Sequence, residues 1–153
     1  MNKSVLLTIV LSTFLLSSCQ SGSIGTNSFV TEKGEIIGHV WKLSSAKKEG
    51  KSIKPINGYI PLLHFYNNGV IKGFTGINSI YGSYTLDDNK IIFSDGFGRE
   101  RKKGSVEIMS QEKAFLKVIK GSHQIYRTNR TLYLHKPETG ITLVFKRTEN
   151  EIN

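Results

Sequence analysis

The feature that most limits how this chain can fold is a succession of short runs rich in β-branched and aromatic residues, separated by turn-forming residues. The sequence has 15 glycines but only 3 prolines, a balance that favours many turns over long helices. Asn67-Asn68-Gly69 is a strong hairpin signal, because Asn and Gly accept positive φ. The pattern predicts about eight short antiparallel strands, over residues 36–45, 59–66, 70–74, 79–86, 90–94, 124–128, 130–135 and 141–147.

One segment departs from the strand pattern. Between Val106 and Lys120, apolar residues recur at spacings of three, four and seven, which places them on one face of a helix. These residues are Ile108, Met109, Phe115, Leu116 and Ile119. Ser105 is placed to cap the start of this helix, and Gly121 to supply the left-handed residue after its end. We therefore predict a mainly β (α+β) fold, in which one amphipathic helix packs on a small antiparallel sheet or open barrel.

The N-terminus carries the features of an export signal. A positive start at Lys3 precedes an apolar run over residues 5–16, which is shorter than the roughly 20 residues that a membrane-spanning helix needs. The run ends in Leu16-Ser17-Ser18-Cys19, which resembles the lipobox of bacterial lipoproteins. The resemblance implies a diacylglyceryl thioether on Cys19, cleavage after Ser18 and acylation of the new N-terminus. The alternative is an ordinary secretory signal that contains a cysteine.

Cys19 is the only cysteine, so the chain has no internal disulfide and no cysteine-based zinc site. We predict a signal peptide over residues 1–18, a flexible tether over 19–35, one domain over 36–148 and a disordered tail over 149–153. The residue after the cysteine is Gln20 rather than Asp, which resembles the signal for sorting to a Gram-negative outer membrane. The expected location is therefore the bacterial cell envelope, on the outer membrane and facing the periplasm.

Several motifs within the domain resemble one known family. The segments that carry the resemblance are Trp41-Lys42-Leu43, Leu63-His64-Phe65, Gly73-Phe74-Thr75-Gly76-Ile77-Asn78, Tyr81-Gly82-Ser83-Tyr84, the helical pair Glu112 and Phe115, Leu132-Tyr133-Leu134, and Leu143-Val144-Phe145. Together they resemble the META domain of HslJ-type heat-inducible bacterial lipoproteins, over about residues 40–147. The resemblance implies a small antiparallel β domain with one helix and no established catalytic residues. A second resemblance is to the lipid-binding cracked barrel of secretion pilotins, which are also small lipoproteins.

The chain departs from the META pattern at two positions. The family often has cysteines where Ile77 and Gly104 stand here. Loss of such a bridge costs about 2–4 kcal/mol, so the resemblance leads us to expect a buried Ile77 in compensation.

The motif residues Gly73, Thr75, Gly76 and Asn78 have two interpretations. Two glycines allow close backbone approach and two polar side chains can bind, so the run could hold a ligand. Alternatively, it forms a tight β connection in which Asn78 bonds backbone. We favour this structural loop, because phosphate binding needs a helix directly after the loop and a strand is predicted there.

No catalytic or metal-binding pattern is apparent. His39, His64, His123 and His135 lack the spacing of metal ligands, and no Gly-x-Ser-x-Gly run or pair of carboxylates stands out. We expect no enzymatic activity, no metal and no cofactor.

The net charge is +9, and the densest basic run contains Arg99, Arg101, Lys102 and Lys103. This run is either a solvated loop or a contact for anionic envelope surfaces. A second basic cluster contains Lys47, Lys48 and Lys51. Nucleic acid is not expected as a partner, because the chain is exported.

Aromatic residues crowd the region between residues 59 and 97. They are interpreted mainly as core, and alternatively as a groove for an acyl chain or peptide. The leading hypothesis is a non-enzymatic, lipid-anchored envelope protein with a structural or binding role in envelope stress tolerance. Its partners would be the membrane, through Cys19, and an envelope protein or lipid. The alternative is a pilotin-like carrier that binds a lipid or a peptide segment of an outer-membrane partner.

Overall fold

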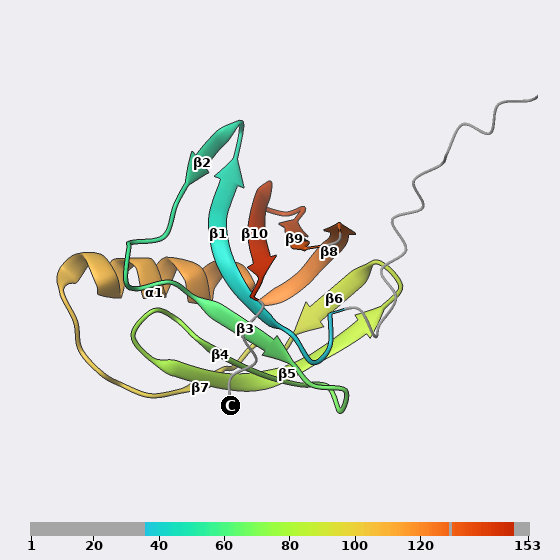
Figure 1. The fold of residues 1–153 in the computed structure, drawn as a ribbon, viewed down its shortest axis with the longest axis horizontal. Helices are drawn as coiled ribbons and strands as arrows, with labels where there is room; N and C mark the ends of the chain where they lie inside the picture. The colour runs from blue at the N-terminus through green and yellow to red at the C-terminus, as the bar shows by residue number, and fades with distance from the viewer. Residues whose placement is uncertain (1–35, 129, 149–153) are drawn as a thin grey trace, which may run out of the picture.

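The structure, a computed structural model, describes residues 36–128 and 130–148. Within these residues the chain forms ten strands and one helix (Figure 1). The elements are β1 (Val40–Lys48), β2 (Lys51–Ile53), β3 (Leu62–Phe65), β4 (Val70–Phe74), β5 (Ser79–Asp87), β6 (Lys90–Phe93), β7 (Gly98–Arg99), α1 (Val106–Ile119), β8 (Gly121–Thr128), β9 (Thr131–Lys136) and β10 (Ile141–Arg147). The predicted signal peptide, Cys19, the tether and the C-terminal tail lie outside the described residues.

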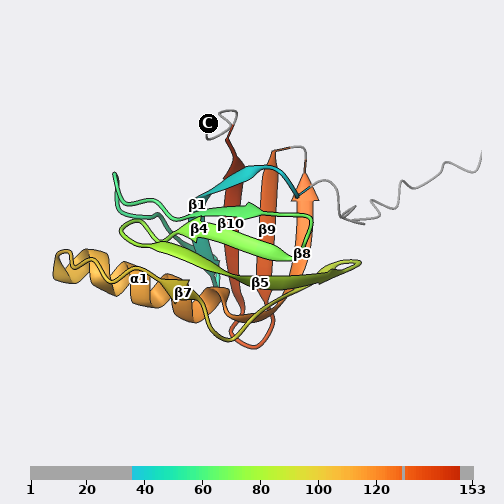
Figure 2. The same cartoon turned by 90° about the horizontal axis from the view of Figure 1, so that it is seen from below.

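Eight of the strands close into an antiparallel barrel, in the order β1-β3-β4-β5-β6-β8-β9-β10. Closure is made by β1, which pairs with β3 along one edge and with β10 along the other. The predicted mainly β fold is confirmed, but the barrel is closed rather than open (Figure 2). Closure satisfies backbone groups that an open edge would leave unpaired. The short strands β2 and β7 pair with β1 and β5 and extend the sheet beyond the barrel.

Turn residues fix the hairpins where the sequence predicted them. In the β3–β4 hairpin, Gly69 has a φ of +77°, and Tyr66 N donates to Val70 O at 2.9 Å. In the β5–β6 hairpin, Asp88 adopts a φ of +45°, a value that aspartate tolerates better than most residues. These turns set the register in which buried and exposed side chains alternate.

Three predicted strands differ from the structure by three or more residues at one or both ends. The strand predicted over residues 124–128 is longer and is β8, which begins at Gly121. The strand predicted over residues 59–66 begins only at Leu62, because Pro61 has no N–H to give to the ladder. The strand predicted over 36–45 is instead β1, which starts at Val40 and runs on to Lys48. The strands β2 and β7, of three and two residues, were not predicted, since such short runs carry no periodic pattern.

Large apolar side chains fill the interior of the barrel. Those whose relative exposure is below 2% are Trp41, Phe65, Phe93, Phe145, Ile36, Leu63, Ile71, Ile91, Ile119, Ile125, Leu132 and Leu134. They form one cluster with Phe115 of α1 and with residues from the strands on all sides. The domain therefore has a single packed core.

The helix α1 lies at one end of the barrel (Figures 1 and 2). The predicted caps are confirmed: Ser105 Oγ accepts from Ile108 N at 3.4 Å, and Gly121 follows the helix with a φ of +79°. Lys136 Nζ donates to the carbonyls of Val118 and Lys120, which places a cation at the negative end of the helix dipole.

Candidate functional site

The motif loop between β4 and β5 is a tight connection held by its own polar groups. Thr75 N donates to Asn78 O at 2.9 Å, and Asn78 N donates to Thr75 Oγ1 at 3.1 Å. A Cβ on Gly76 would lie 2.4 Å from Tyr59 O, and one on Gly73 would lie 2.4 Å from Leu62 O. Both glycines therefore allow close approach to the chain's own backbone.

The loop contacts α1 through the buried carboxylate of Glu112, which is 1% exposed. Glu112 Oε1 accepts hydrogen bonds from Thr75 Oγ1 and from Asn78 Nδ2, both at 2.9 Å. Glu112 Oε2 accepts from Arg99 of β7 at 3.1 Å. A buried carboxylate requires such partners, because desolvation disfavours its charge. This network joins α1 to two separate parts of the sheet.

Two further contacts extend the network. Asn78 also binds the backbone of Lys102, whose N–H donates to Asn78 Oδ1 at 2.7 Å. On the preceding residue of the helix, the Gln111 side chain accepts from Ile56 N at 2.7 Å and donates to Tyr59 O at 2.6 Å. Gln111 and Glu112 of α1 therefore hold the segments that precede β3 and β5, and Asn78 holds the segment that precedes α1.

The two positions where the META family often has cysteines lie side by side. A Cβ on Gly104 would be 2.6 Å from Ile77 Cδ1. The Ile77 side chain thus occupies the space next to Gly104. We expected Ile77 to be buried, but its side chain is only half-buried. It lies at the surface of this junction and is not part of the core cluster.

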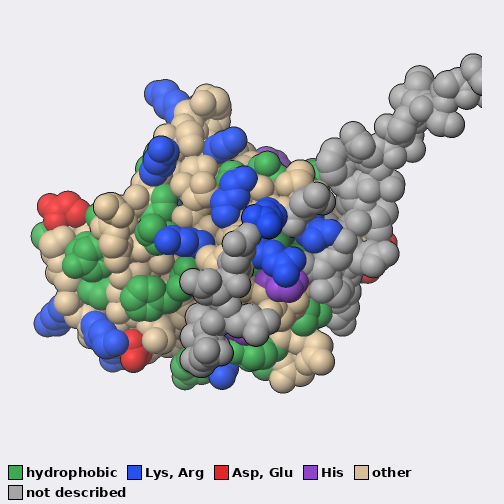
Figure 3. Space-filling view, in the orientation of Figure 1, with side chains coloured by type: hydrophobic (Ala, Val, Ile, Leu, Met, Phe, Trp, Pro, Cys, Tyr) green, Lys and Arg blue, Asp and Glu red, His purple; other side chains and the backbone are tan. Residues whose placement is uncertain are grey.

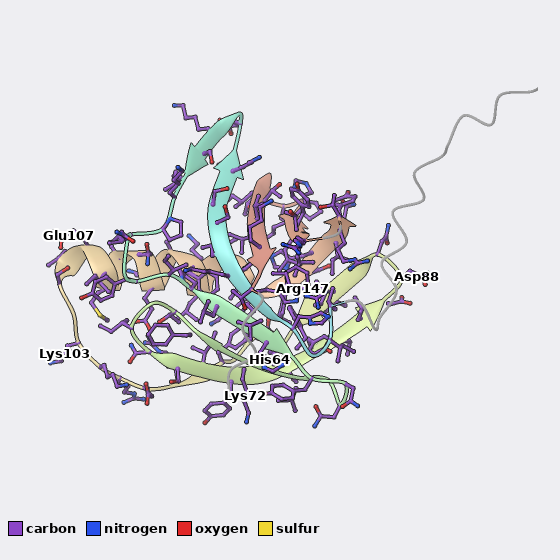
Figure 4. All side chains as sticks on the ribbon, viewed as in Figure 1. His64, Lys72, Asp88, Lys103, Glu107 and Arg147 are labelled. Carbon is purple, nitrogen blue, oxygen red and sulfur yellow. The ribbon has the colours of Figure 1, made fainter. Side chains whose placement is uncertain are left out.

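The four residues of the densest basic run are not equivalent. Arg99 is paired with Glu112, and Lys102 Nζ lies 3.0 Å from Glu100 Oε2. The pKa of Glu100 is lowered, first by the hydrogen bond from the backbone of Ser79 and then by Lys102. Arg101 and Lys103 are exposed in the loop before α1, where Figure 4 labels Lys103.

A groove of about 710 Å³ runs between α1 and the segment around β7. Its apolar lining comes from Phe97, Met109 and Leu116, and its basic rim from Lys113, Lys117 and Lys120. The predicted apolar stripe of the helix is therefore divided. Phe115 and Ile119 enter the barrel core, whereas Met109 and Leu116 are half-buried and line this groove.

The four histidines do not form a cluster, and each contacts different residues. His64 stacks on Tyr66 with ring centroids 4.3 Å apart, and its pKa is lowered by burial and then by Lys72, which lies beside it (Figure 4). His135 Nδ1 is 3.0 Å from Thr142 Oγ1, and His39 packs edge-on to Trp41. Among the described residues, no three His, Cys, Asp or Glu side chains form a group that could hold a metal ion.

His123 is fully buried beneath α1. Its Nε2 lies 3.1 Å from Val118 O. Since a carbonyl only accepts, Nε2 carries the proton. Burial is the main cause that lowers the pKa of His123 to about 4, and Lys136 adds to it. The ring is therefore neutral at pH 7.

Sequence reasoning missed the central position of Glu112. The signal was present: Glu112 falls between Ile108 and Phe115 on the apolar face of the predicted helix. A carboxylate at such a position is buried and therefore must be paired. What the sequence could not show is that its partners come from the motif loop and from β7.

These features define a class: a small closed β-barrel with one helix across its end, fastened through a buried glutamate to a glycine-containing loop. The META domain family matches residues 34–150, and the chain belongs to this family. A search of curated proteins finds no match.

Solved structures share the fold. The chain is similar to a protein from Burkholderia xenovorans solved by NMR, with 26% identity and a TM-score of 0.63, over 76% of this chain and 86% of that one. It is also similar to a DUF4847 family protein from Bacteroides vulgatus, known from a crystal structure, with 11% identity and a TM-score of 0.53, over 76% of this chain and 96% of that one. At 11% identity the second similarity shows the fold alone.

In the described part of the chain, no helix is long and apolar enough to cross a membrane.

Proposed function

We propose that this chain is a non-enzymatic, lipid-anchored protein of the bacterial cell envelope, whose META domain acts by binding at its surface. The observation that carries the proposal is the filled barrel: its interior is occupied by apolar side chains from strands on all sides and from α1. In the part of the chain that the structure describes, the two grooves formed at β1 and at α1 are open to solvent. A structural or binding role in envelope stress tolerance is in keeping with the family.

The buried polar groups support the same proposal. The carboxylate of Glu112 is used to attach the helix and accepts from three side chains. The ring of His123 is fully buried. Both side chains are at most 1% exposed and are engaged in contacts within the protein.

The anchor is tested by expressing the full chain in a Gram-negative host supplied with labelled palmitate. We expect a labelled protein in the outer-membrane fraction, and mass spectrometry of its N-terminal peptide should start at a triacylated Cys19. Cys19→Ser should lose both the label and the membrane association. A wild-type chain that is secreted without label would overturn the anchor.

A second candidate is the pilotin-like carrier. It is favoured by the groove along α1, where Phe97, Met109 and Leu116 provide an apolar lining beside three lysines. In this alternative the groove accepts a lipid or a peptide segment of an outer-membrane partner.

Native mass spectrometry distinguishes the two candidates. The domain without Cys19 would be purified from cell envelope and its mass measured without denaturation. A bound lipid or peptide that is lost in a Met109→Lys/Leu116→Lys variant supports the carrier. An unliganded mass for the wild-type domain supports the first proposal.

A further inference from the structure

A second groove lies beside β1, between the closing strands β1 and β10 and the segment that follows β2. Its volume is about 440 Å³, within the range of small-molecule sites. Three lysines line it, each from a different segment: Lys42 from β1, Lys146 from β10 and Lys54 from the segment after β2. The apolar part of the lining comes from Leu43, Pro55 and Ile60.

The charges in this groove are of one sign. Lys42 and Lys146 are direct cross-strand partners in the β1–β10 ladder, an arrangement that is unfavourable for two like charges. Among the described residues, no carboxylate pairs with Lys42, Lys54 or Lys146. Lys146 Nζ donates instead to the neutral Thr131 Oγ1 at 2.6 Å. In Figure 3, Lys and Arg side chains gather over this face of the molecule.

Where it borders the groove, strand β1 is irregular. The β1–β10 register shifts between Leu43 and Ser45, so Ser44 has no partner in the ladder and lines the groove. Bulges of this kind re-aim side chains and are frequent beside functional sites. The bulge thus adds a hydroxyl donor to the three ammonium groups.

We propose that this groove binds a phosphate group attached to an apolar moiety. Three lysines without a carboxylate suit an anion with more than one negative oxygen, and lysine is a common phosphate ligand. The walls formed by Leu43, Pro55 and Ile60 provide apolar surface for the attached group. The headgroup of an anionic phospholipid and a free phosphate ester share this chemistry. The proposal goes beyond the proposed function and does not depend on the lipid anchor.

The test uses a chain that starts at Gln20, which retains every contact described within residues 36–148. Its binding would be measured by flotation with vesicles of phosphatidylcholine alone and of phosphatidylcholine mixed with phosphatidylglycerol. In parallel, NMR titrations would use glycerol 3-phosphate and inorganic phosphate. The groove variant is K42Q/K54Q/K146Q. The matched control, K90Q/R101Q/K103Q, removes the same charge from other exposed positions and includes two residues of the densest basic run.

We expect binding by the wild-type chain and a loss of at least about tenfold in the groove variant, against a much smaller loss in the control. Ser44→Phe, which keeps every charge but fills the groove, should weaken binding as the triple variant does. Binding to the mixed vesicles alone identifies a lipid headgroup, and saturable binding of glycerol 3-phosphate identifies a free ester. Equal losses in the two triple variants, unchanged binding by Ser44→Phe, or no binding in any arm would overturn the proposal.

Discussion

Glu112 shows how a single residue can connect separate parts of this fold. Its two carboxylate oxygens accept from Thr75 and Asn78 on one side and from Arg99 on the other. The two neutral donors belong to the motif loop, where they are almost fully buried. Arg99 is 43% exposed and can be solvated by water if its partner is removed. The cost of losing Glu112 therefore falls mainly on the buried loop.

Glu112→Ala should lower the free energy of unfolding by about 2–4 kcal/mol. It leaves one Nδ2 hydrogen of the buried Asn78 without an acceptor, and it leaves the Thr75 hydroxyl with only the weaker bond to Asn78 O at 3.2 Å. Glu112→Gln keeps one acceptor oxygen and should cost about half as much. Urea denaturation measures both. Lys113→Gln, an exposed change on the same helix, is the control. A loss in Glu112→Ala no larger than in the control would contradict this account.

Because the pKa of His123 is lowered in the folded protein, we expect the stability to depend on pH. Its pKa is about 4 in the folded protein and about 6.5 when unfolded. Between these values the unfolded chain binds more protons, so stability falls as pH decreases from about 7 towards 4. At pH 5 the free energy of unfolding has lost about 2 kcal/mol through this shift in the pKa of His123.

The variant that tests this is His123→Gln, which retains a donor for Val118 O but does not titrate. Urea denaturation at pH 7 and at pH 5 should show a smaller difference in unfolding free energy for the variant than for the wild-type chain. His135→Gln is the control, because that ring is half-exposed and hydrogen-bonded to Thr142. An equal pH dependence in His123→Gln and the wild-type chain would refute the assignment.

At the scale of elements, the β1–β10 pair closes the barrel with two lysines facing each other. Lys146→Glu converts this pair to opposite charges and should raise the unfolding free energy by about 0.5–1 kcal/mol, while reducing binding to anionic vesicles. The reciprocal control is Lys90→Glu, which places a glutamate opposite Asp87 in the β5–β6 ladder. It should lower stability and leave vesicle binding nearly unchanged. A Lys146→Glu variant that is less stable than the wild-type chain would contradict the like-charge argument.

The junction between the motif loop and the segment before α1 can be bridged covalently. Because Ile77 and Gly104 are adjacent, the double variant I77C/G104C in a chain starting at Gln20 should form a disulfide. Oxidation should stabilise that variant by about 2–4 kcal/mol relative to its reduced form. Thiol titration and unfolding with and without reductant measure this. Two free thiols after oxidation would show that the positions cannot be joined.

The predictable elements were those with a local signal. The bounds of β4 and β10 and the caps of α1 follow from alternation, turn residues and capping residues. The closure of β1 on β10 joins residues far apart in sequence, and no local pattern specifies it. The lysine groove was missed for the same reason, since Lys42, Lys54 and Lys146 meet only after closure. By contrast, Arg99 and Lys102 stand out as a run in the sequence but are partly neutralised by glutamates in the fold.

At the scale of the whole molecule, barrel and helix share one core. Trp41, the only tryptophan, is fully buried on β1, and its Nε1 donates to Ile36 O at 3.0 Å. It belongs to the same cluster as Phe115 and Ile119 of α1. Separate unfolding of the helix would expose these two side chains together with the end of the barrel, so the helix and the barrel should unfold together.

This predicts a single unfolding transition. Trp41 fluorescence reports on the closing strand β1, and far-UV circular dichroism reports on the secondary structure that includes α1. Both should give the same midpoint and the same free energy of unfolding in urea. Phe115→Ala should lower the stability by about 3–5 kcal/mol and shift the two curves equally, because it leaves a cavity in the shared core. A circular dichroism transition that precedes the loss of Trp41 fluorescence would instead show that α1 is a separate unit, docked on a barrel that is stable without it.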